Sequence, residues 1–193
     1  KHAVIDRARD MGFELEAHEV PDIMKRFKEL ADRKKRVFDS DLEAIITGKK
    51  ASTVGPWSLQ WLSVVSRVSG EEDPTASLTL AHENGDTATQ TGEGDGPVDA
   101  IVKALESITG MDITVLNLAM RSISLGEDAQ GEASMRAMVD GVEYSGHGLS
   151  TDIVAACAEA LLEIVNRASR HAERRAERGE GPAKPASPRS NAA

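Results

Sequence analysis

The stretch "TASLTLAHENGDTATQTGEGDGPVDAIVKALESI", residues 75–108, carries most of one structural unit. Two runs with β-forming residues flank Asn84-Gly85, a dipeptide that strongly favours a tight hairpin turn. A glycine-rich segment then leads through Pro97 into a run whose apolar residues recur at helical spacing. Together with an apolar run just upstream, the stretch predicts a βββα unit with strands at 57–68, 75–81 and 86–91 and a helix at 97–108.

The same order of signals occurs a second time along the chain. Asp140-Gly141 holds the hairpin position, between strands predicted at 132–139 and 142–145. A strand at 113–125 precedes this hairpin, and a helix from 151 to about 166 follows it. We therefore predict the α+β class, with two βββα units over 57–110 and 111–168 that are related by a pseudo-twofold axis in one domain, 57–168.

The two flanks of this domain differ from it in composition. Residues 1–48 have helical periodicity and predict a helical subdomain, and 49–56 read as a linker. Residues 169–193 predict an Arg-rich helix end that passes into a tail rich in Pro, Ala and Ser. Because the tail has few apolar residues to offset its ordering entropy, we expect disorder after Gly179.

Composition narrows the functional class. The formal charge of -9 over 193 residues disfavours a nucleic-acid partner, which needs a contiguous basic surface. No apolar run reaches membrane-span length and no signal-peptide pattern opens the chain, so we expect a cytoplasmic protein without a membrane partner. The single cysteine agrees with that location. The first residue is Lys1, not Met, which suggests a piece of a longer protein.

Catalytic and metal-binding patterns are missing from the sequence. The segment "GEGDGP", 92–97, fits neither the dinucleotide fingerprint nor the P-loop. The five histidines have no metal-ligand spacing, and Cys157 falls on the apolar face of a helix without an indicated base. The sequence therefore predicts no catalytic residue, no metal and no cofactor in this chain.

The glycine-rich segment instead suggests a small ligand. A strand-to-helix turn places backbone N–H groups at the positive end of a helix, which favours an anion. Asp95 and Asp99 disfavour a phosphate dianion there and suit an ammonium beside a carboxylate, so the pattern points to an amino-acid zwitterion. The alternative is that the glycines only serve the turn and Asp99 caps the helix. "GHGLSTDIV", 146–154, offers a similar turn in the second unit, where Thr151 or Asp152 could cap and His147 is more typical of a hydrogen-bonding loop residue than of a ligand.

Four segments resemble, in order and spacing, the C-terminal part of the bacterial α-isopropylmalate synthase family. They are "RFKELADRKKRVFDSDLEAI" (26–45), "GEGDGPVDAIVKAL" (92–105), "LGEDAQGEASM" (125–135) and "GHGLSTDIVAACAEALLEIVN" (146–166). The resemblance implies an upstream (β/α)₈ barrel, absent here, that condenses acetyl-CoA with 2-oxoisovalerate using a divalent metal, Mg or Mn. Residues 1–48 would then be the linker subdomain beside that barrel, and no role is assigned to His2.

The resemblance also implies what the two units do. In this family the domain forms a homodimer and binds leucine as a feedback inhibitor near the subunit interface. The ligand residues that it implies are Gly94, Gly96, Pro97, Val98, Asp99 and Ala100 in the first unit, Asp128 and Ala129 in the matching segment 125–135, and Gly146, Gly148, Thr151, Asp152 and Ile153 in the turn predicted before the last helix. Two alternatives stay open: the regulator of a citramalate synthase, which answers to isoleucine, and a free-standing, non-catalytic amino-acid-binding module.

Overall fold

The computed structural model describes residues 2–11, 13, 15–33, 37, 41–42, 45–46, 55–67, 72–122, 131–179 and 181. Its first part contains two helices, α1 (His2–Asp10) and α2 (Val20–Arg33). The first unit comprises β1 (Trp57–Val65), β2 (Thr75–His82), β3 (Thr87–Glu93) and α4 (Pro97–Thr109). The second unit comprises β4 (Ile113–Ser122), β5 (Gly131–Val139), β6 (Val142–Ser150) and α5 (Ile153–Glu177). The predicted α+β fold with two βββα units is confirmed.

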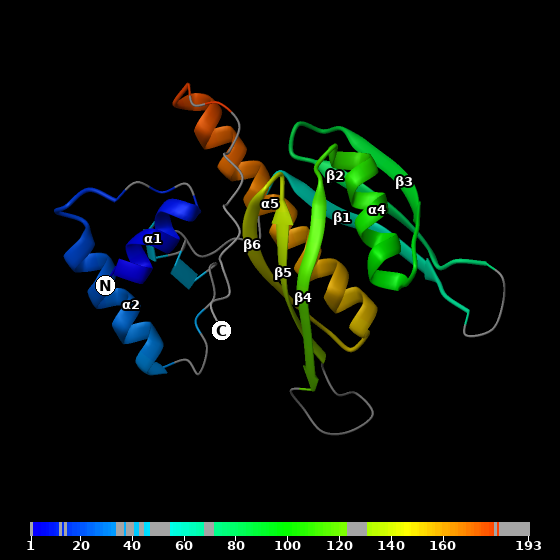
Figure 1. Cartoon of the computed structure of the whole chain (residues 1–193), viewed down its shortest axis with the longest axis horizontal. Helices are drawn as coiled ribbons and strands as arrows, with labels where there is room; N and C mark the ends of the chain where they lie inside the picture. Colours follow the sequence, from blue (N-terminus) through cyan, green and yellow to red (C-terminus); the bar gives the residue numbers. More distant parts are fainter. Residues whose placement is uncertain are drawn as a thin grey trace, which may run out of the picture.

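Each unit builds its own antiparallel sheet, in the order β1-β2-β3 and β4-β5-β6 (Figure 1). Both predicted hairpin turns are present: Gly85 has a φ of 95°, and Asp140 and Gly141 have φ of 49° and 82°. The two units also share an irregularity. The first strand of each sheet shifts its pairing register, between Leu59 and Trp61 in β1 and between Val115 and Asn117 in β4. Such shifts increase local twist, so the two sheets curve at equivalent places.

The helices join the two units into one core. Helix α4 packs on β2 and β3, α5 packs on β5 and β6, and the two helices touch each other. In Figure 1, α4 lies in front of its sheet and α5 behind its own, as a pseudo-twofold relation requires. One continuous hydrophobic cluster contains fully buried side chains from both units, among them Leu78, Leu80, Ile101, Met135, Leu161 and Ile164.

Glycines in the strands allow the helices to approach closely. A Cβ atom added to Gly92 would overlap the Ala100 carbonyl oxygen of α4, and one added to Gly148 would overlap the Ala156 carbonyl oxygen of α5. A Cβ atom added to Gly146 would likewise overlap the Ala160 carbonyl oxygen of α5. This packing explains one wrong prediction: β6 does not end at Ser145 but continues to Ser150, because "GHG" is strand backbone under a helix and not a turn.

Helix α5 is also longer than predicted. The helix continues to Glu177, so the helix predicted to about Asn166 and the Arg-rich helix end predicted from 169 form one continuous element. Its arginines are held by specific partners, which keeps the polar second half ordered. Arg170 binds Glu83 of the β2–β3 turn at 2.6 Å, and Arg174 donates to the Met11 carbonyl at 2.9 Å. The remaining strand and helix ends differ from the predictions by a few residues.

The N-terminal part has its own small cluster. Met11, Ile23 and Leu42 are buried there, with Phe13 and Phe27 packed against them. The predicted helical subdomain is therefore represented by α1 and α2, while most of its third predicted helix lies outside the described residues. The same holds for most of the predicted linker and, apart from Gly181, for the tail after Gly179. None of the helices described is long and apolar enough to cross a membrane.

Candidate functional site

The first-unit turn leaves the start of α4 without a side-chain cap. Gly94 donates its N–H to the Pro74 carbonyl at 3.1 Å, which fixes the end of β3. Gly96 is the N-cap residue, with φ -158° and ψ 171°, and no side chain accepts a hydrogen bond from the first turn. Pro97 follows at the first helical position, where a missing N–H is no loss. The helix start therefore presents its partial positive charge at a glycine-lined turn.

Asp99 does not cap the helix, contrary to the alternative prediction. Its Oδ2 accepts the Asp95 N–H at 3.1 Å, so it closes the turn in front of the helix. Gly94 makes room for this carboxylate, because a Cβ at that position would overlap Asp99 Oδ2. Five of the six predicted first-unit residues thus surround one helix start, with a carboxylate already beside it. Ala100 is fully buried and faces the core instead.

The second unit begins its helix differently. Asp152 is the N-cap of α5, and its Oδ1 accepts the N–H groups of Val154 at 2.8 Å and Ala155 at 3.3 Å. Of the two predicted capping candidates, Asp152 is therefore the one used. Thr151 and Ile153 are exposed beside it. The predicted glycine turn is not there, because Gly146 and Gly148 lie within β6 beneath α5.

Helix packing gives the true correspondence between the units. Gly92 and Gly148 each lie four residues before the N-cap, and each lies against a carbonyl four residues after it. Gly92 is therefore the partner of Gly148, and Gly94 corresponds to Ser150. The uncapped glycine start of α4 has no copy in the second unit. Asp128 and Ala129, the other predicted ligand residues, lie outside the described residues.

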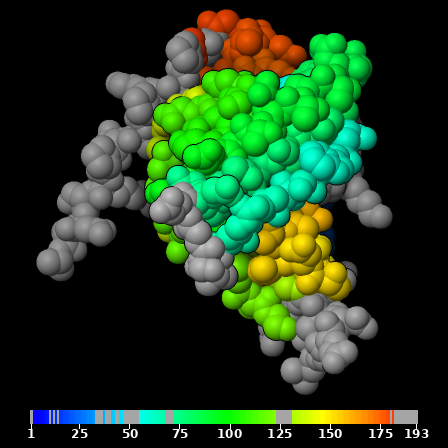
Figure 2. Space-filling view, turned by 90° about the vertical axis from the view of Figure 1, so that its right-hand side faces the viewer, coloured from blue at the N-terminus to red at the C-terminus, as the bar shows by residue number. Residues whose placement is uncertain are grey.

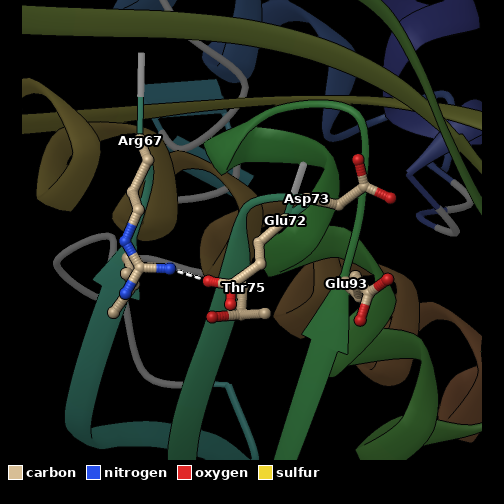
Figure 3. Close-up of a pocket in the computed structure, with 6 residues that line it drawn as sticks. Arg67, Glu72, Asp73, Thr75 and Glu93 are labelled. Atoms are coloured by element: carbon tan, nitrogen blue, oxygen red, sulfur yellow. Dashed lines mark ion pairs between the residues drawn. The ribbon is translucent and has the colours of Figure 1, made fainter. Parts of the chain in front are cut away.

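A polar pocket that sequence reasoning missed lies near the first-unit turn. It measures about 390 Å³ and is lined by Val65, Arg67, Glu72, Asp73, Thr75 and Glu93. Val65, Thr75 and Glu93 are cross-strand neighbours on the face of the sheet away from α4. Figure 3 shows Arg67 reaching toward Glu72, with which it forms an ion pair, while Asp73 and Glu93 extend on the other side.

This pocket suits a positively charged group. Three carboxylates and one guanidinium line it, so its charge is net negative. Glu93 directly precedes Gly94, although none of the eleven predicted ligand residues that the structure describes lines the pocket. Strand register brings Val65, Thr75 and Glu93 together, while Arg67, Glu72 and Asp73 come from the segments that flank β1 and β2.

Charged side chains of α5 cover β6, the edge strand of the second sheet. Glu163 accepts the backbone N–H of His147 at 2.7 Å and binds Arg167 at 2.7 Å. Burial raises the pKa of Glu163, but the hydrogen bond from His147 and the Arg167 charge outweigh it and leave that pKa below its ordinary value. The hydrogen bond to Glu163 raises the pKa of His147. Together with Glu159, which accepts the Leu149 N–H at 3.0 Å, this group covers an edge strand, which is a structural task.

The described residues offer no obvious nucleophile or metal centre. Cys157 is buried, and burial raises the pKa of its thiol, which disfavours the reactive thiolate. Within the described ranges, no three His, Cys, Asp or Glu side chains come together to hold a metal ion.

Three large apolar side chains of the second unit, near the end of β4, the end of β6 and the start of α5, are exposed. Met120, Leu149 and Ile153 are all more than a third exposed. Figure 2 shows the first unit covering most of one face, with the end of β4 and the start of α5 emerging beneath it. On the first unit, Trp61 and Val65 are exposed on the outer face of β1. Apolar groups left in water in this way mark surfaces that can take a ligand or a partner.

Comparisons with known proteins identify the family to which this domain belongs. A family model described as the LeuA allosteric (dimerisation) domain matches residues 36–169. A 2-isopropylmalate synthase of Rhodopirellula baltica is 37% identical over 166 residues, which is 86% of this chain and 31% of that protein. Proteins with the same name from Synechococcus sp. (strain CC9311) and Prochlorococcus marinus (strain NATL1A) are 36% and 37% identical over 167 residues, again 86% of this chain and 31% of theirs. The chain thus spans about a third of the length of these relatives, and it belongs to the LeuA allosteric (dimerisation) domain family.

Proposed function

We propose that this chain is the regulatory part of a 2-isopropylmalate synthase, and that it binds leucine as a feedback inhibitor. The observation that carries the proposal is the family match over 36–169, which includes both helix starts described above. The relatives bear this enzyme's name, and the described residues offer a binding arrangement instead of a nucleophile or a metal centre. Condensation of acetyl-CoA with 2-oxoisovalerate, and the Mg or Mn ion that assists it, would belong to a barrel outside this chain.

Leucine recognition follows from the chemistry of the first-unit turn. The uncapped start of α4 suits the leucine carboxylate, because backbone N–H groups and the helix dipole both favour an anion there. The Asp95 and Asp99 carboxylates at the same turn suit the ammonium group. In the second unit Asp152 already occupies the first N–H groups of α5, so that helix start is not expected to take a second carboxylate.

Regulation would act through a shift of population. If leucine binds one arrangement of the regulatory part more tightly than the other, its binding energy favours that arrangement and lowers the activity of the barrel. Dimerisation would place the exposed apolar side chains Trp61 and Val65, or those around Ile153, against a second copy. A small differential affinity suffices, because about 1.4 kcal/mol changes an equilibrium constant tenfold.

Calorimetric titration of the chain with leucine, isoleucine and valine tests this proposal. Leucine is expected to bind most tightly, whereas a preference for isoleucine would assign the chain to the citramalate synthase type. The variant Gly96→Val probes the site itself, because a Cβ at Gly96 meets no atom within 4 Å and the fold should tolerate it. Leucine binding is expected to weaken in this variant and to persist in Thr87→Val, an exposed control on β3. Unchanged binding in Gly96→Val, or no binding in the folded dimeric chain, would overturn the assignment.

A further inference from the structure

We propose that β3 (Thr87–Glu93) pairs edge to edge with β3 of a second copy of this chain, so that two three-stranded sheets join into one. Strand β3 lies at an edge of the first sheet, whose order is β1-β2-β3. In Figure 1 it forms the outer rim of the first unit, on the side away from the second unit. The structure describes the strand and both of its flanking segments throughout, from residue 72 to residue 122.

Every second residue of β3 turns its backbone polar groups away from β2. The Gly94 N–H, just after the strand, donates to the Pro74 carbonyl at 3.1 Å and therefore points toward the start of β2. Because this direction alternates along an antiparallel strand, the N–H and C=O groups of residues 87, 89, 91 and 93 point outward from the sheet. No hydrogen bond among the described residues uses these outward groups. The strand thus presents a row of donors and acceptors that another strand could pair with.

The second unit closes the equivalent edge, on β6, with carboxylates of α5. Glu159 and Glu163 accept outward N–H groups of β6 at 3.0 and 2.7 Å. They are the seventh and eleventh residues after Asp152, the N-cap of α5. Carboxylates in this position satisfy the edge donors and leave no place for a further strand.

Helix α4 offers no such closure for β3. The seventh and eleventh residues after Gly96, its N-cap, are Lys103 and Ser107. The Lys103 side chain carries donors only, and the Ser107 hydroxyl donates to the Lys103 carbonyl at 2.9 Å. The two units therefore differ at equivalent places: β6 has its outward donors covered, and β3 keeps its own open.

The other two edge strands, β1 and β4, are interrupted. Each contains a register shift, which disrupts the row of outward groups. Strand β3 pairs with β2 without a shift, and its sequence, TATQTGE, contains no proline and no lysine. Shifts, prolines and lysines are the common devices that keep an edge strand from pairing. Among the edges of the two described sheets, β3 is thus the one that has none of these protections.

A second copy of β3 is the occupant that the chain itself supports. The family model that matches residues 36–169 is described as a dimerisation domain, so we expect a surface for a second copy in this part of the chain. A twofold axis lets one strand pair with itself in antiparallel direction. With Gln90 opposite Gln90 of the second copy, all seven residues pair and Thr87 lies opposite Glu93, so no like charges face each other. The proposal rests on the homodimer of the proposed function and does not depend on leucine binding.

Side chains beside the strand suit this register. Gln90 lies on the α4 side of β3, two residues before the buried Gly92, and is nevertheless exposed, so α4 leaves the twofold axis uncovered. Lys103 lies over Gly92, because a Cβ atom added there would come within 2.8 Å of the Lys103 Cβ. In this register Asp86 of the second copy comes near Lys103, so opposite charges meet across the axis. The Lys103 ammonium is mostly in water, 3.3 Å from Glu106, and is available for this contact.

Amide hydrogen exchange of the whole chain, resolved by residue, tests the pairing directly. In the dimer the outward amides of residues 87, 89, 91 and 93 are expected to be protected. Dilution below the dissociation constant is expected to accelerate their exchange by about tenfold or more. The inward amides of residues 88, 90 and 92 are the control within the same strand, because β2 protects them in both states.

The variant Thr89→Pro tests the same contact by sedimentation equilibrium. Proline removes an outward N–H that the sheet itself does not use, so the fold should tolerate it on this edge. We expect the dissociation constant of the dimer to rise by about tenfold or more, because both copies lose a donor. The matched control Thr89→Ala loses the same side chain but keeps the N–H, and should stay within about twofold of the wild type.

The exposed apolar side chains named above are the alternative dimer contact. A dimer that is unchanged in Thr89→Pro but lost in Trp61→Ser would overturn the proposal. Outward amides that exchange equally fast in dimer and monomer would do the same without any variant, as would a chain that stays monomeric. Protection of these amides in the monomer would mean that another segment of the chain covers β3, which also excludes the second copy. Leucine titration is read separately, so a β3-paired dimer that binds no leucine would support this pairing and contradict the proposed leucine site.

Discussion

The Asn166 side chain on α5 holds both backbone polar groups of Trp57 at the start of β1. Its Oδ1 accepts the Trp57 N–H and its Nδ2 donates to the Trp57 carbonyl, each at 2.9 Å. The two residues lie 109 positions apart and belong to different units. Asn166 is 5% exposed, and Gly55 has no side chain where a Cβ would overlap Asn166. A helix of the second unit thus fixes the first strand of the first unit.

Replacing this amide should destabilise the fold strongly. Asn166→Ala leaves two backbone groups without their partners in a mostly buried place, and each unsatisfied group costs about 1–3 kcal/mol. We expect the free energy of unfolding to fall by about 2–4 kcal/mol in denaturant titrations. Asn117→Ala, on an exposed position of β4, serves as the control and should change it by less than about 0.5 kcal/mol. Equal effects of the two variants would contradict the bridging role of Asn166.

The strand glycines should tolerate no side chain. In Gly148→Ala the new methyl group meets the backbone carbonyl of Ala156, which cannot rotate away, so α5 must shift from its sheet. Overpacking of this kind costs about 1–3 kcal/mol and should lower the midpoint of thermal unfolding. Gly96→Ala, whose Cβ meets no atom within 4 Å, is the matched control and should unfold at the wild-type temperature. A Gly148→Ala variant as stable as the control would show that the close approach of α5 is not required.

Stability of the second unit should depend on pH through His147 and Glu163. The pKa of His147 is raised above 6.5, so its contribution is present below pH 6.5 and is lost as pH rises through the folded-state pKa. The pKa of Glu163 is lowered below 4.5, so its contribution is present above pH 4.5 and is lost as pH falls through the folded-state pKa. The pair therefore stabilises most between pH 4.5 and 6.5.

Unfolding free energies measured from pH 4 to pH 8 check this window. His147→Gln should flatten the decline above pH 6.5 while keeping the backbone N–H that Glu163 accepts. Arg167 and Glu132 also act on His147, and their charges shift its pKa in opposite directions. The variant His82→Gln, on β2, serves as the control for loss of a histidine elsewhere in the fold. An identical pH profile in the wild type and in His147→Gln would refute the coupling.

Local sequence signals predicted the elements but not their extents. Asn84-Gly85 and Asp140-Gly141 marked both hairpins, because glycine, and less often Asp or Asn, adopts the positive φ found at Gly85, Asp140 and Gly141. Gly146 and Gly148 were wrongly predicted to form a turn, because they lie within β6. Glycine serves turns and close helix contacts equally well, and only the packing of α5 on β6 separates the two cases.

Long-range contacts explain what the sequence could not predict. The second half of α5 lacks apolar periodicity, but Glu83 and Met11, from distant parts of the chain, order its arginines. The acidic pocket forms because strand pairing aligns Val65, Thr75 and Glu93. For the glycine-rich turn of the first unit, the sequence located the start of α4 correctly, whereas only the structure showed that Asp99 accepts a hydrogen bond from the Asp95 N–H instead of capping the helix.

Arg174 should hold α1 against α5. Its guanidinium lies 4.3 Å from the centre of the Phe13 ring and donates to the Met11 carbonyl at 2.9 Å. Arg174→Leu removes both contacts, of which the cation–π contact alone contributes about 0.5–2 kcal/mol, so amide exchange in α1 should accelerate by about tenfold. Exchange in β5 and β6 should stay unchanged, because they pack on α5 through other residues, and Arg178→Leu should leave α1 as protected as in the wild type. Helix α5 touches α4, at whose start the proposed leucine site lies, and its Arg174 contacts Phe13. Slower exchange in α1 on addition of leucine to the wild type, absent in Arg174→Leu, would therefore mark α5 as the element that couples this site to α1. Unaltered α1 exchange in Arg174→Leu would show that α1 is held elsewhere.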